Sequence, residues 1–196
     1  ANGPAIVYAL KERGFKVFLD LKFHDIPHQV EGAAYAAAGS GADMLTMHTV
    51  GGVDMMAAAQ RGAERAAAEY GHDVPATLGI TVLTSMNDAA LAETGVSRAM
   101  ADQVVVLAEQ AKRAGISGVV ASPQEAARLR DILGAHAYIV TPGVRPAGAA
   151  KGDQSRVATP VEAFANGASH IVVGRPITAA EDPVAAYQRC VREFVG

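Results

Sequence analysis

The stretch Asp20-Leu21-Lys22-Phe23-His24-Asp25-Ile26-Pro27 follows an apolar, strand-like run, Lys16-Val17-Phe18-Leu19. It places a lysine between two carboxylates at the point where a strand ends and the chain turns into a helix. Side chains on a strand alternate between its two faces, so we expect Asp20 and Lys22 to point the same way. Buried charges are costly unless they are paired, and a charged group at the mouth of a strand is typical of a functional site. An ordinary surface salt bridge is the simpler alternative.

Short apolar runs alternate along the whole chain with longer alanine-rich segments of helical pattern. The expected strands are Lys16–Leu21, Asp43–His48, Thr77–Leu83, Gly118–Ser122, Tyr138–Thr141 and His170–Gly174. The expected helices are Pro4–Arg13, Pro27–Ala38, Val53–Tyr70, Ser97–Ala114, Pro123–Leu133, Pro160–Asn166 and Pro183–Phe194. Several helices begin with proline in the first turn and several end near glycine, as helix termini prefer. Strands that alternate with helices predict βαβ units and a parallel sheet.

Polar residues gather where the predicted strands end, at Asp20/Lys22, His48, Thr84-Ser85, Ser122, Thr141 and Gly174-Arg175. A (β/α)₈ barrel builds its active site from the C-terminal ends of all its strands, whereas a doubly wound sheet uses one switch point. We therefore expect an α/β fold of the TIM (β/α)₈ barrel type. Only six strands are predicted where a complete barrel has eight. The expectation is a single barrel domain over residues 1–196, N-terminally incomplete and without its first two strands.

Composition excludes several functions. The chain has 196 residues and a formal net charge of −3, which gives no general reason to bind nucleic acid. Cys190 is the single cysteine, so no internal disulfide can form, and a reducing, cytoplasmic location is expected. No apolar run is long enough to span a membrane. Neither a G-x-G-x-x-G nor a Walker A motif is present, so no nucleotide cofactor is indicated.

The loops after the last two predicted strands suggest a phosphate site. Gly174-Arg175-Pro176 follows the last strand, where barrels frequently bind phosphate, and the planar guanidinium of Arg175 suits that anion. An arginine that only covers the barrel edge is the alternative. Thr141-Pro142-Gly143-Val144-Arg145-Pro146 opens a loop over residues 147–156, whose Gln154 could donate an amide N–H to a ligand. A surface excursion without function is the alternative there.

A lysine flanked by carboxylates limits the chemistry. A Schiff base needs a neutral amine, which the neighbouring carboxylates oppose. A charged Lys22 is better suited to act as a general acid that protonates a developing carbanion. Asp20 would hold that ammonium and would be a poor neighbour for a substrate carboxylate, which favours loss of CO₂. His24, His28 and His48 lack convincing metal-ligand spacing, so we expect ordinary polar or capping roles and no metal.

The motifs together resemble those of the orotidine 5′-monophosphate decarboxylase family, in its bacterial form. The resemblance spans almost the whole chain, in family order. It rests on Phe18-Leu19-Asp20-Leu21-Lys22-Phe23-His24-Asp25-Ile26-Pro27, Thr81-Val82-Leu83-Thr84-Ser85-Met86, Thr141-Pro142-Gly143-Val144-Arg145-Pro146, Gly152-Asp153-Gln154 and Val173-Gly174-Arg175-Pro176.

The resemblance implies decarboxylation of orotidine 5′-monophosphate to UMP and CO₂ in de novo pyrimidine biosynthesis, without a cofactor. It implies that Lys22 donates a proton to C6 of the pyrimidine and that Asp20 lies beside the substrate carboxylate. Asp25 is similar to a carboxylate that the family lends across a homodimer interface. The implied substrate-binding residues are Ile26, Thr84, Pro142, Arg145, Gln154, Gly174 and Arg175, with Thr84 at the pyrimidine and Arg145, Gln154, Gly174 and Arg175 at or near the phosphate.

The chain departs from the family pattern in two places. Gln29 stands where similar sequences often have Thr. The family also has an Asp on its first strand and a Lys on its second, and neither is in this sequence, so we expect the chain as printed not to be fully active. Two alternatives stay open. One is a metal-dependent sugar-phosphate decarboxylase of the same superfamily, which shares the Asp-x-Lys-x-x-Asp core, and the other is a barrel that binds UMP without turning it over.

Overall fold

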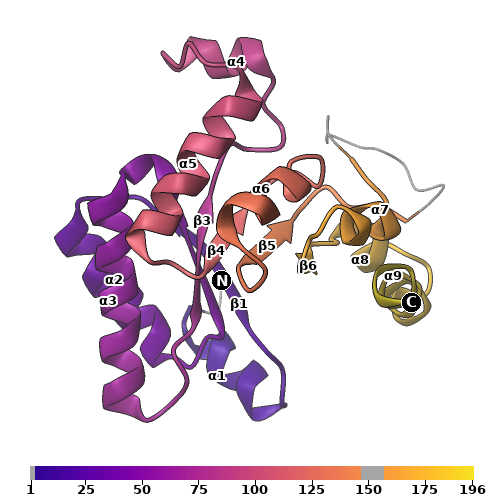
Figure 1. The fold of residues 1–196 in the computed structure, drawn as a ribbon. Coiled ribbons are helices and arrows are strands. Elements are labelled where there is room, and N and C mark those ends of the chain that lie inside the picture. The colour runs from indigo at the N-terminus through magenta and orange to yellow at the C-terminus, as the bar shows by residue number, and fades with distance from the viewer. Residues whose placement is uncertain (1–2, 147–156) are drawn as a thin grey trace. The chain divides into compact units, whose positions relative to one another are not determined.

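The computed structural model describes residues 3–146 and 157–196 (Figure 1). These residues divide into two compact units. The first comprises Ala1–Thr81 and Leu107–Val119, and the second comprises Val82–Val106 and Val120–Gly196. The expectation of a single domain stays a prediction.

The first unit is a parallel sheet with helices between its strands. Its elements are α1 (Ala5–Glu12), β1 (Phe18–Phe23), α2 (Pro27–Gly39), β2 (Met44–His48), the 3₁₀ turn η1 (Thr49–Gly51), α3 (Val53–Tyr70) and β3 (Ala76–Ile80), while α5 (Met100–Ala114) and β4 (Gly118–Val120) are divided between the units. Strand β1 pairs with β2 and β2 with β3, both in parallel. Figure 1 shows α2 and α3 side by side.

The second unit continues the same alternation. Its elements are α4 (Asp88–Glu93), α6 (Ala126–Leu133), β5 (Tyr138–Thr141), α7 (Pro160–Ala165), β6 (His170–Ile171), α8 (Arg175–Thr178) and α9 (Pro183–Val195). Strands β5 and β6 are parallel, and Ala121, just after β4, donates its N–H to the Val140 carbonyl at 3.1 Å.

Every strand and helix expected from the sequence is present, with ends that shift by a few residues. Val53–Tyr70 and Tyr138–Thr141 match at both ends. Prolines begin α2, α7 and α9 as expected. Helices were expected to end near glycine, and Gly14, Gly115 and Gly167, which follow three helix ends, all have positive φ. The sequence did not predict three short elements, η1, α4 and α8, because so few residues carry no clear period.

Small side chains let α2 and α3 pack closely. Ala37 and Ala38 of α2 and Ala63 and Ala66 of α3 belong to one buried cluster with Leu45 of β2. A Cβ atom at Gly62 would lie 2.2 Å from the Glu31 carbonyl oxygen. Only glycine, which has no Cβ, avoids this clash. The two helices therefore approach to backbone contact, and this fixes them over the sheet that carries β1 and β2.

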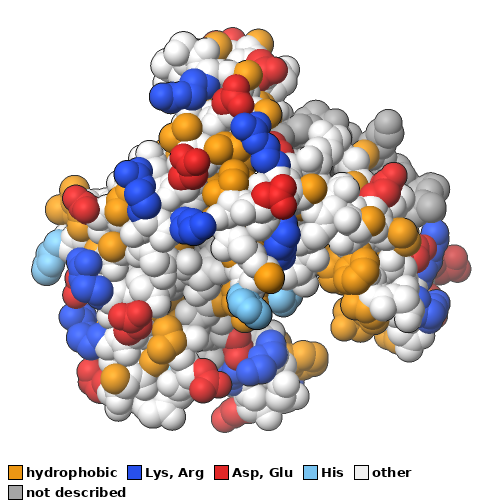
Figure 2. Space-filling model, viewed as in Figure 1, with side chains coloured by type: hydrophobic (Ala, Val, Ile, Leu, Met, Phe, Trp, Pro, Cys, Tyr) orange, Lys and Arg blue, Asp and Glu red, His pale blue; other side chains and the backbone are white. Residues whose placement is uncertain are grey.

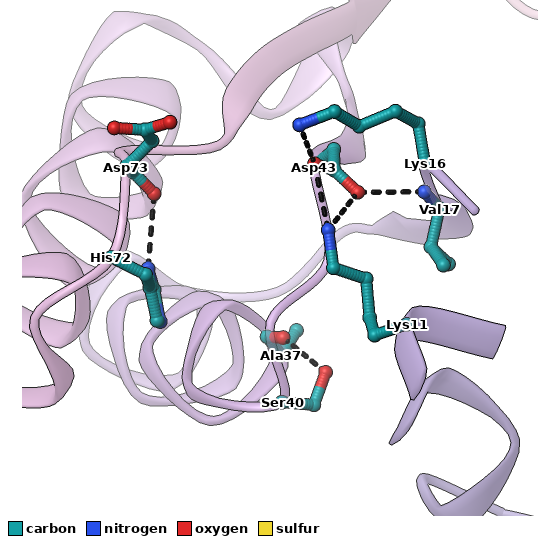
Figure 3. Close-up of polar contacts among 8 residues, drawn as sticks. All are labelled: Lys11, Lys16, Val17, Ala37, Ser40, Asp43, His72 and Asp73. Atoms are coloured by element: carbon teal, nitrogen blue, oxygen red, sulfur yellow. Dashed lines mark hydrogen bonds and ion pairs between the residues drawn. The ribbon is translucent and has the colours of Figure 1, made fainter. Parts of the chain in front are cut away.

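Asp43, immediately before β2, ties together the N-terminal elements of this unit (Figure 3). Lys11 of α1 donates to both carboxylate oxygens at 2.9 and 2.7 Å, Lys16 lies 2.9 Å from one of them, and the Val17 N–H donates at 2.7 Å. Burial acts to raise the pKa of Asp43, but the hydrogen bonds from Lys11, Val17 and Lys16 outweigh it and lower the pKa to about 2. The carboxylate thus fastens α1 and the start of β1 to β2.

We expect Asp43→Asn to lower the free energy of unfolding by about 1–2 kcal/mol at neutral pH, a value reduced for partial exposure. The pKa of Asp43 is about 2 in the folded state and about 3.9 when unfolded. The contribution is therefore fully present above about pH 4 and is lost as pH falls toward 2. Urea unfolding between pH 3 and 7 measures it, with Asp131→Asn, an exposed carboxylate on α6, as control. A stability difference that is equal at pH 3 and pH 7 would contradict this role.

The surface carries mixed charge. Figure 2 shows acidic and basic side chains interspersed over the visible face, in keeping with the net charge of −3. Within residues 3–146 and 157–196, no helix is long and apolar enough to cross a membrane.

Candidate active site

The C-terminal half of β1 departs from a regular strand. The regular pairing of β1 with β2 continues as far as Leu19, which lies opposite Leu45. It is then interrupted and resumes at Phe23, which lies opposite Met47. Three residues of β1 therefore stand against one of β2, and β1 bulges. Inside this bulge Lys22 has a φ of 52°, and it is the single non-glycine residue with positive φ in the described part of the chain. A left-handed backbone at such a residue costs about 1–3 kcal/mol and is typical of functional sites.

The bulge brings Asp20 and Lys22 together, as the sequence predicted. The Lys22 ammonium forms an ion pair with Asp20 Oδ2, and the two side chains remain 41% and 44% exposed. Thr46, fully buried on β2, accepts a hydrogen bond from the Lys22 backbone N–H at 2.9 Å and donates one to Asp20 Oδ1 at 2.8 Å. The pair is thus an exposed charge pair whose backbone and carboxylate are both held by a buried hydroxyl.

Two histidines lie next to this pair. The rings of His24 and His48 have centroids 5.6 Å apart and planes inclined by 50°. Burial lowers the pKa of His48, the positive charges of His24 and Lys22 lower it further, and Asp20 opposes them. These effects favour the neutral form of the His48 imidazole. No group of three or more His, Cys, Asp or Glu side chains among the described residues could hold a metal ion.

Asp25 and Ile26 lie in the turn between β1 and α2. Asp25 Oδ1 accepts the Ile26 backbone N–H at 2.7 Å. Both side chains are exposed, and that of Ile26 is 63% exposed. Gln29 is exposed in the first turn of α2, which begins at Pro27. The turn therefore exposes the Asp25 carboxylate and the Ile26 side chain on the surface.

In the second unit, Thr84 and Arg145 lie where the sequence placed them, in the segments that follow β3 and β5. Thr84 is half-buried and lies in a turn. The Met86 N–H closes this turn by donating a hydrogen bond to the Leu83 carbonyl at 3.0 Å. After Pro142, Arg145 donates its backbone N–H to Ala158 at 2.9 Å. The Arg145 Nε atom is buried and has no hydrogen-bond partner among the described residues. Gln154 lies outside the described residues.

Gly174 and Arg175 form the start of α8, just beyond β6. Both residues are exposed. The Gly174 carbonyl accepts the N–H groups of Ile177 at 2.9 Å and Thr178 at 3.1 Å, so the chain turns into a helix directly after the strand. The side chain of Arg175 thereby stands at a helix start that follows a strand end, as expected of a phosphate-binding position in a barrel.

Sequence reasoning missed Thr46. This residue lies inside an apolar strand and belongs to no charged motif, so it reads as core. One signal could have indicated it. A lone hydroxyl in an otherwise apolar strand, on the neighbour of a strand with a charged end, has to find a polar partner when buried.

Comparison with known proteins shows the family of this chain. A family model described as "Orotidine 5′-phosphate decarboxylase / HUMPS family" matches residues 1–190. The chain is 50% identical to orotidine 5′-phosphate decarboxylase of Moorella thermoacetica over 195 residues, which are 99% of this chain and 77% of that protein. It is 52% identical to the enzyme of the same name from Alkalilimnicola ehrlichii over 194 residues, 99% of this chain and 80% of that protein.

A solved structure supports the fold. The crystal structure of orotidine 5′-phosphate decarboxylase from Lactobacillus acidophilus matches with a TM-score of 0.87 and 42% identity, covering 99% of this chain and 82% of that one. The predicted α/β fold of the TIM-barrel type is confirmed by this likeness, and the described residues supply six of its strands. The chain belongs to the orotidine 5′-phosphate decarboxylase / HUMPS family.

Proposed function

We propose that this protein decarboxylates orotidine 5′-monophosphate to UMP and CO₂, a step of pyrimidine biosynthesis, with Lys22 as the proton donor. Relatives that share about half of its residues are named for this reaction. The observation that carries the proposal is the Asp20–Lys22 ion pair, held at the end of β1 by a strained backbone and a buried hydroxyl.

The chemistry follows from a charged amine beside a carboxylate. Breaking the bond between C6 and the carboxylate releases CO₂ and leaves an electron pair at C6. The Lys22 ammonium forms the new C6–H bond with that pair and then regains a proton from water. Asp20, ion-paired with Lys22, holds the ammonium in place before the reaction begins. Charge that is oriented in advance stabilises the transition state without reorganisation during the reaction.

We assign phosphate binding to Arg175 and Gly174 after β6 and to Arg145 after β5. A buried Arg145 Nε without a partner among the described residues is a donor suited to an anionic ligand. Thr84, half-buried in its turn, is assigned to the pyrimidine, and Pro142 and Ile26 to apolar contacts with substrate. Gln154 keeps its assignment to the phosphate from the family resemblance alone. Phosphate binding energy can then contribute to catalysis at a distance.

We further propose a homodimer in which Asp25 serves the partner's site. The Asp25 carboxylate bonds the N–H of its own neighbour, Ile26, and both side chains are exposed. This placement leaves Asp25 accessible to a second copy of the chain, as a closed two-fold dimer requires. A cytoplasmic location fits the metabolic role and stays a prediction.

An assay of turnover tests the proposal. We expect the chain to consume orotidine 5′-monophosphate, followed as a loss of ultraviolet absorbance, and to form UMP. A chelator should leave the rate unchanged, because every proposed step uses the chain's own groups. A rate that the chelator abolishes would favour the metal-dependent sugar-phosphate decarboxylase. Calorimetric binding of UMP without any turnover would favour the binding module.

A further inference from the structure

We propose that Thr46 is a positioning residue for this reaction. Its hydroxyl holds Lys22 in the left-handed backbone conformation and fixes the Asp20 carboxylate against the lysine ammonium. This proposal rests on the role assigned to Lys22 above. Thr46 itself lies in β2, outside the charged motif that contains Lys22.

The Lys22 backbone is strained by its positive φ. Strained conformations persist only when the surrounding structure determines them. The bulge interrupts the pairing of β1 with β2 between Leu19 and Phe23, so Lys22 lies where the regular register is lost. Its N–H donates instead to Thr46 Oγ1 at 2.9 Å. This hydrogen bond is partly buried, so removing its acceptor would leave the N–H without that partner at a cost in free energy. The hydroxyl therefore offsets the cost of the conformation that aims Lys22.

The Thr46 hydroxyl also holds Asp20. A threonine hydroxyl has one proton to donate. Since Thr46 Oγ1 accepts from the Lys22 N–H, that proton is directed to Asp20 Oδ1 at 2.8 Å. The other oxygen, Asp20 Oδ2, pairs with the Lys22 ammonium. The contacts close a circuit from the lysine backbone through Thr46 and Asp20 back to the lysine side chain.

The side chains of Asp20 and Lys22 are each more than two-fifths exposed, and an exposed ion pair alone orders its members weakly. Thr46 is 0% exposed and lies between Leu45 and Met47, which are also 0% exposed. Catalytic groups need support from residues whose rotamers are locked by packing. Because packing fixes the Thr46 side chain in the core, its hydrogen bonds can restrict the motion of the exposed Asp20 and Lys22.

The chain offers a matched control in Thr49. This threonine is also 0% exposed and lies in η1, directly after β2. Its hydroxyl donates to the Ile80 carbonyl at 2.7 Å, on the side of β3 rather than β1. Thr46→Val and Thr49→Val each remove one buried hydroxyl and keep the side-chain shape. They differ in whether the lost hydrogen bond reaches Lys22.

The test compares amide hydrogen exchange and turnover in these variants. We expect Thr46→Val to speed exchange of the Lys22 N–H at least about tenfold, because its acceptor is gone. We expect kcat to fall at least about tenfold while KM changes little, since misaligned groups slow the reaction more than they weaken binding. Thr46→Ser, which restores the hydroxyl, should recover both properties. Thr49→Val should leave both near the values of the unaltered chain.

The outcomes separate this proposal from the proposed function. Unchanged Lys22 exchange in Thr46→Val, or an equal loss of kcat in Thr49→Val, overturns the positioning role. Thr46→Ala gives the same comparison if the valine variant does not fold. If Lys22→Ala keeps full turnover while Thr46→Val still speeds Lys22 exchange, the catalytic role of Lys22 fails and the hold of Thr46 on the backbone stands.

Discussion

Replacing Lys22 with alanine lowers kcat for orotidine 5′-monophosphate on the order of 10⁴-fold in our expectation, with little change in KM. General acid catalysis and preorganised charge each contribute factors of about 10² to 10⁴. The alanine variant loses both, because the same ammonium delivers the proton and neutralises developing charge. Steady-state kinetics with the purified variant measures the effect. The fold should persist, since the side chain is 41% exposed and its removal opens no cavity.

Lys16→Ala is the matched control for this experiment. Lys16 is also a lysine paired with an aspartate, Asp43, but its side chain is 83% exposed at the start of the sheet. Its replacement should leave kcat unchanged. A loss in Lys16→Ala as large as in Lys22→Ala would mean that the charge pairs act only through stability. Full activity in Lys22→Ala would refute the proposed mechanism outright.

The same variant tests the shared site of the proposed homodimer. A chain with Lys22→Ala supplies an intact Asp25, and a chain with Asp25→Asn supplies an intact Lys22. Random pairing of equal amounts gives half mixed dimers, each with one intact site of two. The mixture should therefore recover about a quarter of the unaltered rate. A mixture that is no more active than the average of its parts would show that Asp25 does not serve a neighbour.

Replacing Arg175 with alanine is expected to lower kcat/KM about 10²-fold. Hydrogen bonds between charged groups contribute about 1.5–3 kcal/mol each, and the planar guanidinium offers two to a phosphate. Arg175→Lys keeps the positive charge but loses the paired N–H donors of the guanidinium. Its kcat/KM should therefore lie between those of the alanine variant and the unaltered chain. Kinetics with orotidine 5′-monophosphate measure both variants.

The substrate itself provides the sharpest control for Arg175. Orotidine lacks the phosphate that Arg175 is proposed to bind. Arg175→Ala and the unaltered chain should therefore turn orotidine over equally slowly. Arg192→Ala, an exposed arginine on α9, should leave both substrates unaffected. An equal loss on both substrates in Arg175→Ala would place the residue in the fold rather than at the phosphate.

The fold was largely predictable from local patterns. Val53–Tyr70 is a long amphipathic segment that ends before Gly71, a residue with positive φ, and its period alone defines the helix. Strand ends were less predictable. The expected strand His170–Gly174 is only His170–Ile171, and Gly174 already begins the turn into α8. Such ends depend on tertiary hydrogen bonds, which no window of sequence contains.

The candidate site was predictable as far as residue types carry chemistry. Asp20 and Lys22 were expected to point the same way, and they form an ion pair. The alternation of side chains along a regular strand predicts this orientation, whereas the pair actually lies in a bulge in which Lys22 has positive φ. A lysine gives no local sign of that conformation, because the partner that holds it, Thr46, lies 24 residues further along the chain. Contacts of this kind depend on strand register and not on propensity.

The bulge in β1 also bears on how the protein folds. Lys22 and Thr46 are separated by 24 residues, so nothing near Lys22 in sequence can hold its backbone in the left-handed region. The isolated segment would favour an extended chain there, by about the cost of the strain. Strand β2 must therefore dock beside β1 before the lysine backbone takes this conformation. Assembly of the catalytic pair is then a late event of sheet formation, and hydrogen-exchange kinetics during refolding should show the Lys22 amide gaining protection no earlier than the amides of β2.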